Sequence, residues 1–121
     1  MALLTLKFVT DVRDLDYEVV EFHGELDQST LAITEQQIFD FLAGFQRTAL
    51  IFDLRDLAFI NSEGIGFIVS TYMKLVKKNQ QLILCGFKSH VGEVLQLIGL
   101  PKLIPVFSHI TQAIDFIKKK K

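Results

Sequence analysis

This sequence of 121 residues contains no tryptophan, two prolines and a single cysteine, Cys85. One cysteine cannot form an internal disulfide, which is typical of proteins from a reducing compartment. No apolar run approaches the ~18 residues that a membrane-spanning helix needs. The N-terminus lacks the basic flank and the cleavage site of a signal peptide. We therefore expect a cytoplasmic protein without a membrane span, although half of the residues are hydrophobic.

Positive charge is scarce outside the end of the chain. The formal net charge is −1, and the last four residues, 118–121, are all lysine. The rest of the chain is therefore acidic, which argues against direct nucleic-acid binding, because such proteins present a basic face. We interpret the lysine run as the solvated end of a helix, where positive charge complements the helix dipole, in preference to a nucleic-acid or lipid contact.

Motifs of enzymes and metal sites are missing as well. The sequence has no glycine-rich phosphate loop ending in Lys-Ser or Lys-Thr. The three histidines are far apart and lack the spacing of metal ligands. Cys85 lies in an apolar segment, where it is expected to be a small core side chain and not a nucleophile. We therefore expect a protein that is not an enzyme and that uses neither a metal nor a cofactor.

Hydrophobic patterns predict five strands and four helices. Residues 49–54 form a continuous apolar run broken only by Asp53, which is typical of a strand buried on both faces of a parallel sheet. Alternation in the first two segments favours a hairpin, which adds an antiparallel edge. The other strands are expected at residues 3–10, 17–23, 81–85 and 103–107. The predicted order is β-β-α-β-α-β-α-β-α: one α/β domain over residues 1–121, with helices packed against a small mixed sheet.

Capping signals predict where the helices begin and end. The first helix is expected to start at Thr34, with Gln37 completing a capping box. The second is expected to run from Ser62 toward Asn79. The third starts at Ser89 and is closed by Gly99 and Pro101, and the last starts at residue 108 or 111. Residues 24–30 are expected to form a polar loop.

The stretch 59–66, Phe-Ile-Asn-Ser-Glu-Gly-Ile-Gly, places polar residues and glycines between a buried strand and an amphipathic helix. Ser62 is expected to be the N-cap of that helix, a role worth about 1 kcal/mol. Gly66 either allows the helix to pack closely on the sheet or, together with Gly64, leaves a bare backbone for a partner. In the loop at 24–30, Asp27, Ser29 and Thr30 are either turn and cap residues or part of the same surface.

Two motifs carry a resemblance to a known family. They are Gly24-Glu-Leu-Asp27, after the second strand, and Asp53-Leu54 followed after five residues by Ile60-Asn-Ser-Glu-Gly-Ile-Gly66. With the order of elements, they make the chain resemble a STAS domain over essentially its whole length. Within that family it is similar to the stand-alone bacterial anti-sigma factor antagonists, or anti-anti-sigma factors.

The resemblance implies a phosphoprotein that acts in transcription regulation by partner switching. The unphosphorylated protein would bind an anti-sigma factor that is also a serine kinase, and so release a sigma factor. Phosphorylation of Ser62 would end the binding, and a serine phosphatase would reset it. We expect the partner-binding residues to be Asp27, Ser29, Thr30, Asn61, Ser62, Glu63, Gly64 and Gly66, of which the resemblance itself implies Asp27 and Ser62.

Two residues depart from the family's usual Asp-Ser-Ser/Ala-Gly-Leu-Gly pattern. Asn61 replaces an aspartate, which keeps the size and the capping ability but removes a charge. Glu63 replaces a small residue and puts a carboxylate beside the acceptor serine. Two other functions stay open at this point. One is a STAS subunit of a stress-signalling scaffold or of a lipid or anion transport complex, in which Ser62 is only a cap. The other is a small-ligand binder or enzyme with a cleft near Ser62.

Overall fold

The computed structural model describes residues 2–11, 13–14 and 16–119. Within them the strands are β1 (Leu4–Val9), β2 (Tyr17–Leu26), β3 (Ala49–Asp53), β4 (Leu57–Ile60), β5 (Gln81–Cys85) and β6 (Val106–Phe107). The helices are α1 (Gln28–Ala43), α2 (Ser62–Val76), α3 (Ser89–Ile98), the short 3₁₀-helix η1 (Leu100–Lys102) and α4 (Ile110–Lys119). Val12 and Leu15, between the first two predicted strands, and Lys120 and Lys121 of the lysine run lie outside the described residues, as does Met1.

The strands form one mixed sheet in the order β1-β2-β3-β5-β6. Strand β1 is antiparallel to β2, as the predicted hairpin requires, and the other pairs are parallel. Strand β4 pairs with β2 beyond the end of β3, after a register shift at Gly24 and Glu25. The predicted α/β class, a mixed sheet with four helices packed against it, is confirmed. The described residues form one strand, β4, and one 3₁₀-helix, η1, that the predicted order does not contain.

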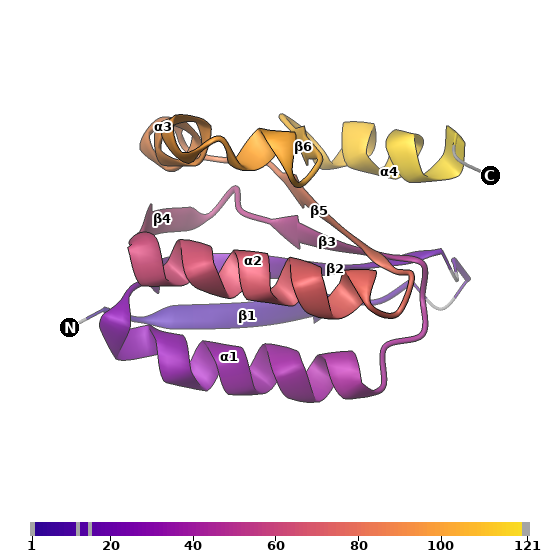
Figure 1. Ribbon diagram of the computed structural model, residues 1–121, viewed down its shortest axis with the longest axis horizontal. Coiled ribbons are helices and arrows are strands. Elements are labelled where there is room, and N and C mark those ends of the chain that lie inside the picture. Colours follow the sequence, from indigo (N-terminus) through magenta and orange to yellow (C-terminus); the bar gives the residue numbers. More distant parts are fainter. Residues whose placement is uncertain (1, 12, 15, 120–121) are drawn as a thin grey trace.

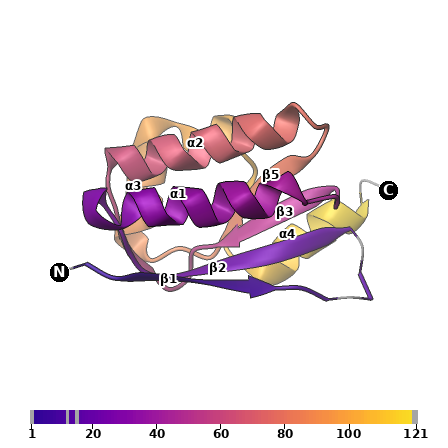
Figure 2. The ribbon, with the colours of Figure 1, turned by 90° about the horizontal axis from the view of Figure 1, so that it is seen from below.

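Helices cover both faces of the sheet (Figure 1). The larger core joins α1, α2 and α3 to one face, and buries Phe22, Phe52 and Phe67 among aliphatic side chains. A smaller core joins α4 to the other face, around Ile51, Ile83 and Cys85. Helices α1 and α2 run side by side and begin at the same end of the molecule (Figures 1 and 2). No helix in the described part of the chain combines the length and apolar character that crossing a bilayer needs.

The boundary between β2 and α1 differs from the prediction. Strand β2 continues through Gly24 to Leu26, and α1 begins six residues before Thr34 is reached, so residues 24–30 are not a loop. Thr34 lies inside the helix, where its hydroxyl donates a hydrogen bond to the carbonyl of Thr30 at 2.8 Å. The helix starts early because Asp27 provides a stronger cap, described below.

Three other boundaries of helices and strands also differ from the prediction. Helix α2 ends at Val76 with Lys77 in the C-cap position, and Asn79 follows in a left-handed conformation, φ 59°. Lys88, not Ser89, occupies the N-cap position of α3. The last strand is short because the backbone N–H groups of Leu103 and Ile104 donate back to the carbonyl of Leu100, at 2.9 and 3.0 Å, and continue the turn of η1.

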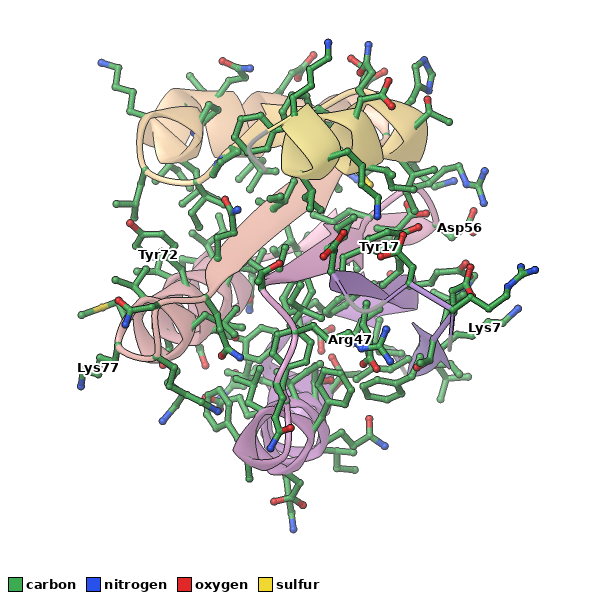
Figure 3. The ribbon with its side chains drawn as sticks, turned by 90° about the vertical axis from the view of Figure 1, so that its right-hand side faces the viewer. Lys7, Tyr17, Arg47, Asp56, Tyr72 and Lys77 are labelled. Carbon is green, nitrogen blue, oxygen red and sulfur yellow. The ribbon has the colours of Figure 1, made fainter. Side chains whose placement is uncertain are left out.

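An ionic contact ties the C-terminal helix to the hairpin between β1 and β2. Lys118 Nζ donates hydrogen bonds to Asp14 Oδ2 at 2.6 Å and to Asp16 Oδ2 at 2.8 Å. It also lies 5.7 Å from the centre of the Tyr17 ring, which faces α4 in Figure 3. The hydrogen bonds from Lys118 and from the backbone N–H of Asp16 hold the pKa of Asp14 below its ordinary value. Its hydrogen bonds to the carboxylates of Asp14 and Asp16 raise the pKa of Lys118.

Replacing Lys118 by methionine is expected to lower the urea midpoint of unfolding at pH 7, and to lower it less as the pH falls below about 4. A carboxyl group whose pKa is depressed in the folded state stabilises the protein above its unfolded-state pKa, and this contribution is lost on acidification. The measurement compares Lys118→Met with wild type from pH 7 to pH 3. Lys119→Met removes a neighbouring charge as the control. A midpoint difference that stays constant with pH would contradict the linkage.

Candidate functional site

The N-termini of α1 and α2 meet at the carboxyl end of the sheet. Strands β2 and β4 end in register, with Leu26 opposite Ile60, and the backbone N–H of Asn61 donates to the carbonyl of Leu26 at 3.2 Å. Each helix begins two residues after its strand ends, so Asp27 and Asn61 occupy equivalent cap positions after adjacent strands. The parallel pairing of two strand ends thus brings together two segments that lie more than thirty residues apart in the sequence.

Asp27 caps α1 through a full set of local hydrogen bonds. Its Oδ1 accepts from the backbone N–H of Ser29 at 2.8 Å and from the Ser29 hydroxyl at 2.7 Å. In return, Thr30 Oγ1 accepts from the backbone N–H of Asp27 at 3.1 Å, which completes a capping box. The hydrogen bond from the Ser29 hydroxyl is the largest of the contacts that hold the pKa of Asp27 below its ordinary value. Asp27 therefore carries a negative charge at neutral pH.

Asn61, and not Ser62, is the N-cap of α2. The side-chain oxygen of Asn61 accepts from the backbone N–H of Gly64 at 2.8 Å. The prediction that Ser62 caps the helix is therefore wrong, because the amide one residue earlier reaches the free N–H. Ser62 becomes the first helical residue and is exposed. Among the described residues its hydroxyl has no hydrogen-bond partner, and it is free to face solvent or a second molecule.

The two glycines of the stretch have different surroundings. A Cβ on Gly64 would lie 2.8 Å from Ile60 Cγ1 and 2.9 Å from Leu26 Cγ, so the close approach of helix and sheet depends on this glycine. A Cβ on Gly66 would meet no described atom within 4 Å, and Gly66 is exposed. The close-packing role that the sequence analysis considered for Gly66 therefore belongs to Gly64. Gly66 is left as bare backbone on the surface beside Ser62 and the exposed Glu63.

One residue near the site was missed by sequence reasoning. Phe59, on β4 and three residues before Ser62, keeps 42% of its surface exposed. The ring Nε2 of His90, at the start of α3, donates a hydrogen bond to the carbonyl oxygen of the neighbouring Ala58. The sequence carries no signal for this exposure, because the outward position of the Phe59 side chain follows from the pairing of β4 with β2. The surface around Ser62 thus includes a large apolar side chain.

Other candidate groups lie elsewhere. Cys85 is buried, and this burial, with the charge of Asp53 as a smaller cause, raises the pKa of its thiol to about 12. The thiol is therefore protonated at neutral pH, which fits the predicted core role. Within the residues that the structure describes, no three His, Cys, Asp or Glu side chains gather closely enough to hold a metal ion.

Comparisons with known proteins identify the family. The STAS domain model matches residues 8–113 of the chain. The anti-sigma F factor antagonist of Paenibacillus polymyxa is 26% identical over 96 residues, which are 79% of this chain and 82% of that protein. The crystal structure of an anti-sigma factor antagonist from Mycobacterium paratuberculosis superposes with a TM-score of 0.84 at 25% identity, covering 96% of this chain and 95% of the other.

Further solved structures share the fold alone. The antagonist SpoIIAA in its unphosphorylated form has a TM-score of 0.76 at 23% identity, covering 97% of each chain. Its phosphorylated form, from Bacillus, has a TM-score of 0.68 at 23% identity, covering 95% of this chain and 99% of the other. The relatives from Paenibacillus polymyxa and Mycobacterium paratuberculosis are both described as anti-sigma factor antagonists. The chain belongs to the STAS domain family and is related to the bacterial anti-sigma factor antagonists.

Proposed function

We propose that this protein is an anti-sigma factor antagonist controlled by phosphorylation of Ser62. In the unphosphorylated state it binds an anti-sigma factor with serine kinase activity, and the sigma factor held by that partner is released. The partner phosphorylates Ser62, the complex dissociates, and a serine phosphatase restores the binding form. The chain itself catalyses no step of this cycle.

The observation that carries the proposal is the free, exposed hydroxyl of Ser62 at the N-terminus of α2. Because Asn61 supplies the cap, phosphorylation of Ser62 removes no hydrogen bond that the helix needs. A phosphate at this position would lie near unpaired backbone N–H groups and the positive end of the helix dipole. The fold can therefore accept the modification, and the solved structures of SpoIIAA, which has the same fold, include a phosphorylated form.

The proposed partner surface combines the first turns of α1 and α2. Residues that expose side chain or backbone there include Ser29, Ser62, Glu63 and Gly66. The other proposed residues, Asp27, Thr30, Asn61 and Gly64, hold the two turns in place through the caps and the close packing described above. A phosphate adds roughly −1.5 to −2 charges to a surface that already carries Asp27 and Glu63. A partner packed against it must then desolvate that charge, and each 1.4 kcal/mol of penalty lowers affinity tenfold.

Incubation with the cognate kinase and ATP is expected to add one phosphate, located on Ser62 by peptide mapping of the product. The phosphorylated protein should bind the anti-sigma factor at least about tenfold more weakly than the unmodified protein. Ser62→Ala should take up no phosphate and should stay bound in the presence of ATP. Intact mass and a binding titration measure these results.

Ser89→Ala is a matched control, because Ser89 is also an exposed first residue of a helix. This variant should be phosphorylated and released like wild type. Phosphate on another residue, or a Ser62→Ala protein that ATP still releases, would contradict the switch. Co-purification with a transporter or a signalling scaffold in place of a sigma-regulating kinase would instead favour a STAS subunit of another assembly.

A further inference from the structure

A second polar site lies at the carboxyl end of the sheet, separate from the Ser62 surface. A cavity of about 410 Å³ opens where β3, β5 and β6 end and α4 begins. Its lining includes Asp53, Arg55, Gly86, Phe87 and His109. Small ligands of open α/β sheets characteristically bind outside the carboxyl ends of the strands, so the position itself is favourable for binding.

The inner part of the cavity holds a carboxylate with unused hydrogen-bonding capacity. Asp53 is only 7% exposed. Its Oδ1 accepts from the backbone N–H of Arg55 at 3.1 Å, whereas Oδ2 has no partner among the described residues. Because this oxygen can still accept a hydrogen bond, the position favours a ligand that brings an N–H group. Gly86, with φ +62°, keeps the space open, since a Cβ there would lie 3.1 Å from Asp53 Oδ1.

The mouth of the cavity carries a positively charged side chain, in contrast to the carboxylate of its inner part. The side chain of Arg55 is exposed, and neither its guanidinium nor the His109 ring forms a hydrogen bond or ion pair with any described residue. The amide groups before α4 are already occupied, because Gln112 Oε1 accepts from the backbone N–H groups of Ser108 and His109 at 3.1 and 3.2 Å. An anion at the mouth would therefore be bound by side chains, chiefly by the guanidinium of Arg55.

We propose that this cavity binds a small zwitterion, such as a free amino acid. The protonated amine donates to Asp53 Oδ2, and the carboxylate accepts from Arg55. The ring of Phe87 and the side chain of Ile110, both in the lining, contact the apolar part of the molecule. A simple anion is excluded from the inner part by Asp53, and a simple cation is disfavoured at the mouth by Arg55, so both charged groups of the ligand are needed.

Thermal unfolding of the full chain tests the proposal, with the twenty common L-amino acids and γ-aminobutyrate at 10 mM each as probes. At least one probe is expected to raise the Tm by about 3 °C or more, as binding to the folded state requires. Calorimetric titration of that probe should give a Kd of about 1 mM or tighter. Butylamine and butyrate, which each carry one of the two charges, should bind at least about tenfold more weakly.

Two substitutions test whether binding depends on this cavity and not on the overall charge of the protein. Arg55→Gln, at an exposed side chain, and Asp53→Asn, which retains an acceptor for the N–H of Arg55, should each weaken binding about tenfold or more. Lys77→Gln, on the exposed end of α2 (Figure 3), should leave binding unchanged. The proposal is overturned if no probe shifts the Tm of the wild type by more than about 1 °C. It is also overturned if Arg55→Gln, which should fold in any case, binds as tightly as wild type.

Discussion

Replacing Gly24 by alanine is expected to lower the free energy of unfolding by about 3 kcal/mol. Gly24 has φ +126°, a conformation that residues with a Cβ rarely adopt. A Cβ there would lie 2.1 Å from the carbonyl oxygen of Leu3, and this oxygen accepts the backbone N–H of Glu25 at 2.8 Å. The clash is therefore with backbone that is itself part of the sheet, and relief requires β1 to move away from β2.

Urea denaturation measures the effect, and Gly44→Ala is the matched control. Gly44 follows α1 with φ −108°, and a Cβ there would meet no described atom within 4 Å. This control should change stability by less than about 0.5 kcal/mol. Equal midpoints for Gly24→Ala and wild type would show that the strand can accept a side chain at this point, contrary to the geometry.

Gly64→Ala is expected to cost about 1–2 kcal/mol of stability. Overpacking of a tight contact typically costs about 1–3 kcal/mol, and the better helix propensity of alanine returns up to about 1 kcal/mol. The added methyl group would press on Ile60 and Leu26, the two residues that bring the helix starts together. The variant should therefore also bind the proposed anti-sigma partner more weakly, because the surface around Ser62 is displaced.

Gly66→Ala provides the comparison within the same helix turn. It should be as stable as wild type or more stable by up to about 1 kcal/mol, because its Cβ would be unhindered and alanine favours the helix. Weaker partner binding by this stable variant would assign Gly66 to the contact surface. A Gly64→Ala protein as stable as Gly66→Ala would contradict the packing described for α2. Urea denaturation measures the stability of both variants, and a binding titration measures their affinity for the partner.

The fold class can be predicted from the sequence because its strongest hydrophobic patterns extend over many residues. These patterns are the apolar run at 49–53 and the periodic apolar positions of the helix after Ser62. Strand β4 was missed because it has four residues, and only Leu57 and Ile60 are buried. Such a segment carries too little periodicity to be separated from a loop. Its existence depends on pairing with β2, which is a long-range interaction.

The helix caps, like the strands, could be predicted from the sequence only in part. The polar stretch that begins α2 can be located from the sequence, but the cap is Asn61 and not Ser62, because the Asn61 oxygen reaches the N–H of Gly64. The Asp27–Thr30 capping box was overlooked because Thr34 and Gln37 fit the usual Ser/Thr-x-x-Glu/Gln pattern better. Residue preference alone cannot choose between neighbouring polar residues. The choice is made where β2 and β4 end, and that point depends on the register of the sheet.

Strand β4 aligns with β2 and not with β3, although β3 immediately precedes it in the chain. The position of Ser62 is therefore independent of the length of the turn at residues 54–56. Insertions or deletions in that turn can change the outline of the molecule beside Arg55 while Ser62 keeps its place beside Asp27. The fold thus allows the turn at residues 54–56 to vary in length without displacing Ser62 from Asp27.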